Sequence, residues 1–346
     1  MAPPTLQNPS IPLNSIILVT AANSLIGSHA CDQILAAGYR VRGTVRNASK
    51  NAWLTPLFNT RHGAGRFELF EVPDMAAPYA WDDCIVDVSG IAHIAGPVEI
   101  FIPDLDAALA DYAPLHIALF EAAKRTPSVK SIAMTSSAWA AYTPKADTRF
   151  VLTEKTWNDE AVRIARDETL KPGEKGWAPF MALKTEMERA CWEWVDKEKP
   201  AFAFNTLLID TVLGSCLDPK NQGIPSTAGF LKDLFYGQGV EIMSQMEPQW
   251  HIDTLDAGKL YLAALVTPGV NGERLFGFAE RYSWPQVIGM FKELHPDREF
   301  PQMVDKGKDI AEVPNQRAEE LVKGVGKSGW VGLKDSVKAN VESFLC

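Results

Sequence analysis

Short apolar segments alternate with amphipathic segments over the first 210 residues of the chain. The apolar segments are rich in β-branched residues, which favours buried strands, and the amphipathic segments repeat apolar positions every three to four residues, which favours helices. The predicted strands lie at 15–20, 40–45, 67–72, 90–95, 129–135 and 202–209, and the predicted helices at 25–37, from 49 onward, at 104–125 and at 177–195. Strands that alternate with helices predict an α/β fold with a Rossmann-like, doubly wound parallel sheet.

After about residue 212 the pattern becomes irregular and richer in glycine, proline and aromatic residues, with helices predicted at 256–266 and 333–344. This change predicts a smaller C-terminal lobe that covers the strand ends and binds the substrate. The predicted division is a flexible tail at 1–14, a Rossmann-like dinucleotide-binding domain at 15–212 and a substrate-binding lobe at 213–346, with 250–266 returning to the Rossmann-like domain.

Composition places the chain among ordinary globular proteins, because 46% of its 346 residues are hydrophobic and 22% are charged. A formal net charge of −9 argues against nucleic acid as a partner, since phosphate backbones attract basic proteins. The five cysteines show neither a CxxC motif nor metal-ligand spacing, so we expect reduced thiols and no metal site. No signal-peptide pattern and no apolar run of membrane-spanning length occurs, and we expect a cytoplasmic protein that binds no membrane.

The turn after the first predicted strand, at 20–29, has the position of a dinucleotide-binding turn. Such a turn carries three glycines, and here their places are held by Ala21, Ser24 and Gly27. If Ala21 needs a positive φ, the cost is roughly 1–2 kcal/mol. We expect the Ser24 side chain to project where the phosphates would lie. The helix N-terminus still attracts an anion, so the sequence predicts weakened rather than abolished dinucleotide binding.

Other predicted cofactor positions follow the second and third strands. Arg46 and Lys50 lie where a 2′-phosphate would bind, with no acidic residue there to hold a free 2′-hydroxyl, which favours NADP over NAD. Asp74 could meet an adenine amino group. A solvated loop is an equally good interpretation of Arg46 and Lys50.

The predicted helix at 177–195 carries an aromatic residue and a lysine one turn apart, Phe180 and Lys184. Residues four apart lie on one face of a helix, and Pro179 suits its first turn, where a missing N–H costs nothing. In a Tyr-x-x-x-Lys pair the ammonium lowers the phenol pKa, so that the phenol can protonate a carbonyl as hydride arrives. Phe180 has no such proton to give.

Several segments match the sequence pattern of a known enzyme family, nearly from end to end of the chain. They lie at 17–20, 38–44, 92–95, 126–130, 135–137, 184–186 and 329–330. In these segments the sequence resembles the extended short-chain dehydrogenases/reductases of the NAD-dependent epimerase/dehydratase type, in the branch of dihydroflavonol reductases and fungal aldehyde reductases. The resemblance implies an oxidoreductase that reduces carbonyls with NADPH through a serine, a tyrosine and a lysine. Ser137 stands at the serine, Lys184 at the lysine and Phe180 at the tyrosine.

Departures from the family pattern gather at positions that face the cofactor. Leu183 replaces a small residue, and Ala118 falls where the family has an asparagine that supports the lysine through water. Ile209 replaces a proline that lies against the nicotinamide, and Asp210 follows it. Because the core pattern is intact, the resemblance implies a fold that has been kept while the hydride machinery has changed.

Three interpretations of the altered site remain open. In the first, the chain runs non-redox chemistry on a carbonyl substrate, as a lyase, cyclase or isomerase: Ser137 and Lys184 bind the developing oxyanion and Asp210 is a candidate base. Aldol-type cyclisation, dehydration and isomerisation are the reactions considered.

In the second interpretation, an NADPH-dependent reductase persists with Ser137, Tyr142 or water as the substitute acid. In the third, the chain is a non-catalytic binding protein. His93, in a predicted strand, is interpreted as a core histidine.

Apolar and aromatic residues are frequent in the predicted lobe, among them Phe230, Leu234, Phe235, Tyr236, Met243, Met246 and Trp250. They predict a bulky, largely apolar or aromatic small-molecule carbonyl substrate, such as a polyketide-like secondary metabolite. The sequence does not predict an oligomeric state.

Overall fold

The computed structural model describes residues 8–97 and 99–345 of the chain. The tail predicted at 1–14 lies partly outside these residues. Within it, Ile11 is fully buried, and the Ser10 N–H donates to the Val266 carbonyl at 2.8 Å. Residues 10 and 11 therefore pack against the body of the protein.

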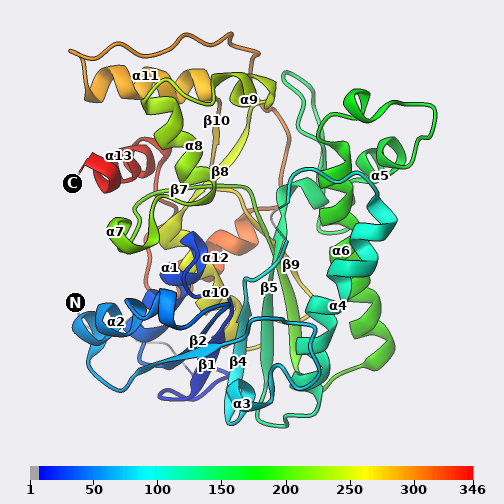
Figure 1. Ribbon diagram of the computed structural model, residues 1–346, viewed down its shortest axis with the longest axis vertical. Helices are drawn as coiled ribbons and strands as arrows, with labels where there is room; N and C mark the ends of the chain where they lie inside the picture. The colour runs from blue at the N-terminus through cyan, green and yellow to red at the C-terminus, as the bar shows by residue number, and fades with distance from the viewer. Residues whose placement is uncertain (1–7, 98, 346) are drawn as a thin grey trace.

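The central sheet of the described chain contains seven strands, all parallel, in the order β3-β2-β1-β4-β5-β6-β9 (Figure 1). This arrangement confirms the predicted Rossmann-like α/β fold. The first six strands match the six predicted ones to within about two residues, and β9 was not predicted. The strands are β1 (Ile16–Val19), β2 (Arg40–Val45), β3 (Phe67–Glu71), β4 (Val88–His93), β5 (Ser131–Ser137), β6 (Ala203–Ile209) and β9 (Arg274–Gly277).

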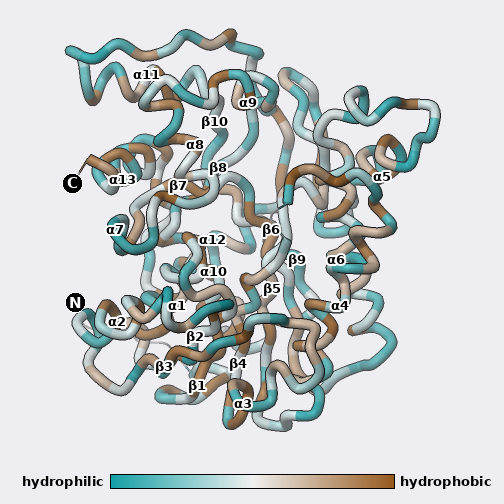
Figure 2. Tube along the Cα trace, in the orientation of Figure 1, coloured by the Kyte–Doolittle hydropathy of each residue, from teal (hydrophilic) through white to brown (hydrophobic). Residues whose placement is uncertain are grey.

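Helices cover both faces of the central sheet, and successive residues of β1 show why. Ile17 and Val19 pack into the core on one face, whereas Ile16 and Leu18 pack into the core on the other, because side chains alternate along a strand. A strand buried on both faces is apolar at every position, as these residues are. Hydrophobic residues accordingly gather along the central strands in Figure 2. The first face is covered by α1 (Leu25–Ala36), α2 (Leu54–His62), α10 (Thr254–Val266) and α12 (Gln316–Gly324), and the second by α3 (Asp82–Ile85), α4 (Leu105–Lys124) and α6 (Ala178–Glu198).

Helix α10 lies far along the sequence but packs directly on α1. A Cβ atom at Gly258 would lie 2.6 Å from the His29 carbonyl oxygen, so glycine is needed for this close approach of the two helices. Strand β9 also joins the central sheet beside β6. Both elements follow residue 212, so the chain returns twice to the central sheet after entering the C-terminal part.

The C-terminal lobe is built around a second, three-stranded sheet in the described chain, ordered β10-β8-β7. Strand β7 begins at Thr211, directly after β6 ends at Ile209, so the lobe starts at the carboxyl ends of the central strands (Figure 1). None of the helices in the described residues is long and apolar enough to cross a membrane. The remaining elements are β7 (Thr211–Leu213), β8 (Gln249–Asp253), β10 (Glu280–Tyr282), α5 (Asp159–Ala165), α7 (Pro219–Gln222), α8 (Ser226–Phe235), α9 (Val240–Gln245), α11 (Trp284–Leu294) and α13 (Leu333–Leu345).

Candidate active site

Ser137 and Asp210 lie at the carboxyl ends of two neighbouring strands. Ser137 is the last residue of β5 and pairs in register with Ile209, the last residue of β6, and Asp210 follows directly. Ligands of open α/β sheets bind at this edge, outside the carboxyl ends of the strands. The fold therefore brings together two of the predicted catalytic residues that are 73 positions apart in the chain.

The Ser137 hydroxyl is half-buried and is held in place by the turn that follows it. Its Oγ accepts a hydrogen bond from the Trp139 N–H at 3.2 Å, as the cap of the short 3-10 turn Ala138–Ala140. A hydroxyl has two lone pairs and one hydrogen, so this bond leaves the hydrogen available for a substrate oxygen.

Phe180 and Lys184 lie one turn apart on α6, as predicted from their spacing. The Phe180 ring packs edge-to-face on the Trp139 ring, with centroids 5.8 Å apart. The Lys184 Nζ lies 5.1 Å from the Phe180 ring centroid and donates to the Pro97 carbonyl at 2.9 Å. Burial lowers the pKa of Lys184 to about 8. The lysine thus keeps its charge at neutral pH beside a ring that cannot donate a proton.

Asp210 is held by two backbone N–H groups, those of Thr211 at 2.8 Å and Trp250 at 3.1 Å. Burial raises the pKa of Asp210 to about 8, against the lowering effect of these two bonds, and the nearby Asp309 raises it further. From the sequence, Asp210 is predicted as a candidate base. A carboxyl group with this pKa carries its proton at pH 7, so in the resting site Asp210 is an acid and becomes a base only as the pH approaches 8.

Tyr142 is only 3% exposed, and its hydroxyl donates to Asp309 Oδ2 at 2.6 Å. Burial together with the nearby carboxyl groups of Asp210 and Asp309 raises the Tyr142 pKa well above its usual value. Its proton is therefore committed to Asp309, which makes it a poor substitute acid. Asp309 comes from the irregular segment between α11 and α12 and has no sequence motif that could have singled it out.

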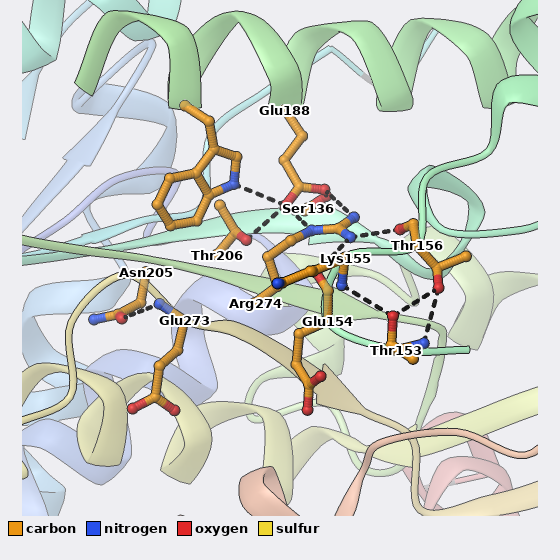
Figure 3. A network of polar contacts seen from close by, with 11 residues as sticks. Ser136, Thr153, Glu154, Lys155, Thr156, Glu188, Asn205, Thr206, Glu273 and Arg274 are labelled. Carbon is orange, nitrogen blue, oxygen red and sulfur yellow. Dashed lines mark hydrogen bonds and ion pairs between the residues drawn. The ribbon is translucent and has the colours of Figure 1, made fainter. Parts of the chain in front are cut away.

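A buried carboxylate, Glu188, ties the helix of Lys184 to the sheet (Figure 3). It lies one turn after Lys184 on α6 and accepts hydrogen bonds from the hydroxyls of Ser136 at 2.7 Å and Thr206 at 2.6 Å. Arg274 of β9 also donates to it, from Nε at 2.9 Å and Nη2 at 3.0 Å. Because Ser136 precedes Ser137, this network sets the position of α6 against the strand that carries Ser137.

His116, on the same helix as Ala118, lies close enough to Lys184 to feel its charge. Ala118 packs with the apolar core between α4 and the sheet. Burial lowers the pKa of His116 to about 4, and the charge of Lys184 lowers it further. His93, predicted as a core histidine, is fully buried and bonds to His116 through ring nitrogens 2.8 Å apart.

The turn after β1 keeps the shape of a dinucleotide turn. Ala21 adopts a φ of 51°, so the condition under which it carries a conformational cost is met. A Cβ at Gly27 would lie 2.0 Å from the Ala21 carbonyl oxygen, so only glycine fits there. The Ser24 side chain does not project freely, because its Oγ caps α1 by accepting the Gly27 N–H at 3.0 Å. One N–H of the helix start is thereby used within the protein.

Gln222 of α7 covers the same turn from the C-terminal lobe. Its two Nε2 hydrogens are shared among three acceptors, the carbonyls of Asn23 at 3.1 Å and Ser24 at 2.9 Å and the Ser28 hydroxyl at 3.0 Å. No sequence motif pointed to this residue, because its partners lie about 200 positions earlier in the chain. The lobe therefore holds the start of α1 in place.

The remaining predicted cofactor residues are exposed in the segments that follow β2 and β3. Arg46 and Lys50 follow β2, and Asp74 follows β3, where its Oδ1 accepts the Ala76 N–H at 2.9 Å. The cradle at Gly27 and the two cations fit a phosphorylated dinucleotide, with one helix N–H fewer to bind it. In the described chain, no group of three or more histidine, cysteine, aspartate or glutamate side chains is placed to hold a metal ion.

Curated proteins resemble the chain along almost its whole length. It is 35% identical over 340 residues to aldehyde reductase 2 of Sporidiobolus salmonicolor, with 98% of each chain covered. It is 32% identical over 341 residues to the NAD-dependent epimerase/dehydratase terH of Aspergillus terreus, covering 98% of this chain and 99% of the relative. It is 35% identical over 343 residues to the ketoreductase adrE of Penicillium rubens, covering 97% and 98%. No family model matches the chain.

Solved structures with low sequence identity share the fold. Gre2 of Candida albicans, in its complex with NADPH, has a TM-score of 0.79 at 20% identity, with 96% of this chain and 99% of that chain covered. Vestitone reductase of alfalfa has a TM-score of 0.72 at 20% identity, with 95% and 97% covered.

Proposed function

The chain belongs to the extended short-chain dehydrogenase/reductase family, of the NAD-dependent epimerase/dehydratase type, and on this premise we propose that it is an enzyme acting on the carbonyl of a small molecule by proton transfer, without hydride transfer. The observation that carries the proposal is Phe180, which stands at the place of the family's tyrosine with its ring between Trp139 and Lys184. General acids contribute about 10²–10⁴-fold to a rate, so their loss weighs heavily on carbonyl reduction.

The retained groups suit the stabilisation of an enolate. The Ser137 hydroxyl donates to the carbonyl oxygen of the substrate, and the Lys184 ammonium adds positive charge near it. Asp210, in its ionised form, takes the α-proton and becomes the neutral acid. The enolate then takes this proton back at another carbon, attacks a second carbonyl whose alkoxide oxygen takes the proton from Asp210, or expels a β-hydroxyl as water with that proton. These outcomes are isomerisation, aldol-type cyclisation and dehydration.

The substrate that we propose is bulky and largely apolar or aromatic, of the kind found among secondary metabolites. Trp139 bonds to Ser137 through its backbone N–H, and both Phe180 and Trp177 pack on the Trp139 ring, with centroids 5.8 Å and 5.7 Å away. The Trp139 Nε1 donates to Gln249 Oε1 at 3.0 Å, so its indole is held in one orientation. A fixed aromatic surface beside the serine favours a flat, apolar ligand.

NADPH-dependent carbonyl reduction is the second candidate, and the names of the relatives favour it, since two of the three are an aldehyde reductase and a ketoreductase. When bound, NADPH would supply a hydride to the carbonyl carbon, and Gly27, Arg46 and Lys50 are the residues that would hold it. Asp210, protonated at neutral pH, would be the proton donor in place of the missing phenol.

The two candidates differ in cofactor demand and in the direction of the pH profile. Aromatic aldehydes and β-diketones serve as probes, with NADPH oxidation followed by absorbance and α-proton exchange followed by NMR in D2O. We expect exchange without NADPH, at a rate that rises with pH toward 8 as Asp210 ionises, and that falls in Ser137→Ala and Asp210→Asn. NADPH oxidation at a rate that falls above pH 8 would instead establish reduction with Asp210 as the acid. The absence of both activities would leave a binding protein.

Phe180→Tyr is the matched variant for the lost acid. We expect it to restore little NADPH oxidation, because the Lys184 Nζ is bonded to the Pro97 carbonyl and Ser24 still occupies a helix N–H. Brisk NADPH oxidation by this variant would mean that the phenol alone was missing, and would contradict the proposal of a site rebuilt for proton transfer.

A further inference from the structure

Three buried side chains form a hydrogen-bonded chain that leads from β1 to α4. The Thr20 Oγ1 lies 3.0 Å from His93 Nδ1, and His93 Nε2 lies 2.8 Å from His116 Nδ1. Thr20 and His93 are fully buried, and His116 is 3% exposed. Neither reaction considered above uses these histidines.

Hydrogen bonding at Thr20 determines where the protons of this chain lie. Its Oγ1 accepts the N–H groups of Ile94 at 2.8 Å and Ala95 at 2.9 Å, which takes both lone pairs, so its own hydrogen is donated to His93 Nδ1. Burial lowers the pKa of His93 well below its usual value and that of His116 to about 4, so both rings are neutral at pH 7. His93 therefore carries its proton on Nε2 and donates it to His116 Nδ1.

It follows that His116 carries its own proton on Nε2. This nitrogen is buried and has no hydrogen-bond partner among the described residues. A buried donor without a partner is costly, and native proteins satisfy nearly all such groups with protein atoms or bound molecules. An orphaned N–H at the end of a chain whose other members are all satisfied points to a bound acceptor.

Room for a small acceptor lies beside Gly96. A Cβ at Gly96 would lie 3.9 Å from His116 Nε2 and 3.5 Å from its Cε1, so the missing side chain leaves space next to the imidazole. The carbonyl of the next residue, Pro97, accepts the bond from Lys184 Nζ. The orphaned N–H and the lysine therefore flank the same peptide, at the edge of the candidate active site.

We infer that the His116 Nε2–H is a binding site for one oxygen acceptor beside Gly96 and Lys184, supplied by a bound water or by a hydroxyl of a bound ligand. The inference rests on hydrogen bonding and does not depend on which reaction the site catalyses. The imidazole N–H is a donor, and the positive charge of Lys184 acts on the same ring, so the site favours an oxygen with a free lone pair over a cation.

The first test is NMR of the full chain labelled with ¹⁵N-histidine. We expect both His93 and His116 to carry the proton on Nε2 at pH 7, and the His116 proton to show a cross-peak to water. A cross-peak that is absent in the free protein, together with a shift of the His116 proton on addition of NADP⁺, would assign the acceptor to a ligand hydroxyl. A proton on Nδ1 of His116, or neither a water cross-peak nor a shift, would overturn the inference.

The second test fills the space with a methyl group. Gly96→Ala makes only ordinary contacts with the imidazole, and alone it should raise the melting temperature, because alanine restricts the unfolded chain. If an oxygen binds there, the methyl displaces it and leaves the N–H unpaired, so we expect a fall of roughly 1–3 °C. The control is Gly96→Ala in a His116→Met background. This background has no imidazole N–H, so Gly96→Ala should not lower its melting temperature. Equal effects of Gly96→Ala in both backgrounds would refute the site.

Discussion

Removing Arg274 should be among the most damaging single changes in this protein, because it leaves a buried charge without a partner. Its side chain is 6% exposed and that of Glu188 is 1% exposed. Arg274→Met removes two of the five hydrogen bonds that the Glu188 carboxylate accepts, and leaves those from Ser136, Thr206 and Trp192.

Breaking a buried ion pair by removing one partner costs about 3–5 kcal/mol of the free energy of unfolding. The guanidinium of Arg274 also donates to the carbonyls of Glu154 at 3.1 Å and Thr156 at 2.5 Å and lies 3.8 Å from the Trp157 ring centroid, which places the expected loss toward the upper end. With an unfolding entropy of about 2.1 cal/mol/K per residue, the chain of 346 residues should lose about 4–7 °C in melting temperature.

Differential scanning calorimetry of four proteins tests this reasoning: the unaltered chain, Arg274→Met, Glu188→Gln and the double variant. Glutamine keeps an oxygen acceptor for the hydroxyls of Ser136 and Thr206 but carries no charge. If an uncompensated charge is the cause, Glu188→Gln should destabilise the unaltered chain and partly restore the Arg274→Met variant. Strictly additive losses in the double variant, or a loss below about 1 kcal/mol for Arg274→Met, would refute the explanation.

Two further predictions concern Ser24 in the turn after β1 and the carboxyl group of Asp210. Ser24→Gly frees the Gly27 N–H and should raise NADP⁺ affinity about tenfold, or 1.4 kcal/mol, measured by calorimetric titration; unchanged affinity would show that this N–H does not limit binding. Because the folded pKa of Asp210, about 8, lies above its unfolded value, the folded state binds the extra proton between about pH 4 and 8, and stability falls as the pH rises through this window. Denaturant unfolding at pH 5 and pH 8 should show this fall in the free energy of unfolding of the unaltered chain and a smaller fall in Asp210→Asn. Equal falls in the two proteins would mean that another group causes the pH dependence.

The sequence by itself determined the fold class and the six leading strands, and it predicted the loss of the proton donor at Phe180. The strands depend on information within a short window, because alternating apolar segments predict them. The four-residue spacing of Phe180 and Lys184 predicts one helix face, but the meaning of Phe180 comes from the family resemblance along the whole chain. The glycine pattern of a dinucleotide turn raised the question of a positive φ at Ala21, and the structure answered it.

Residues without a local signal were decided only by the tertiary structure. Arg274, Asp309 and Gln222 lie in or beside the irregular C-terminal part, and each bonds to a residue at least 86 positions earlier in the chain. Their roles follow from which segments pack together. Strand β9 likewise joins the central sheet beside β6 without having been predicted from the sequence.

Protonation states required the tertiary structure as well. The raised pKa of Asp210 comes mainly from its burial. The tautomer of His116 is set by Thr20, which bonds to His93, which in turn bonds to His116. A sequence names the ionisable groups and their spacing. Desolvation and hydrogen-bond partners depend on every element that surrounds a group, and these elements come together only in the folded chain.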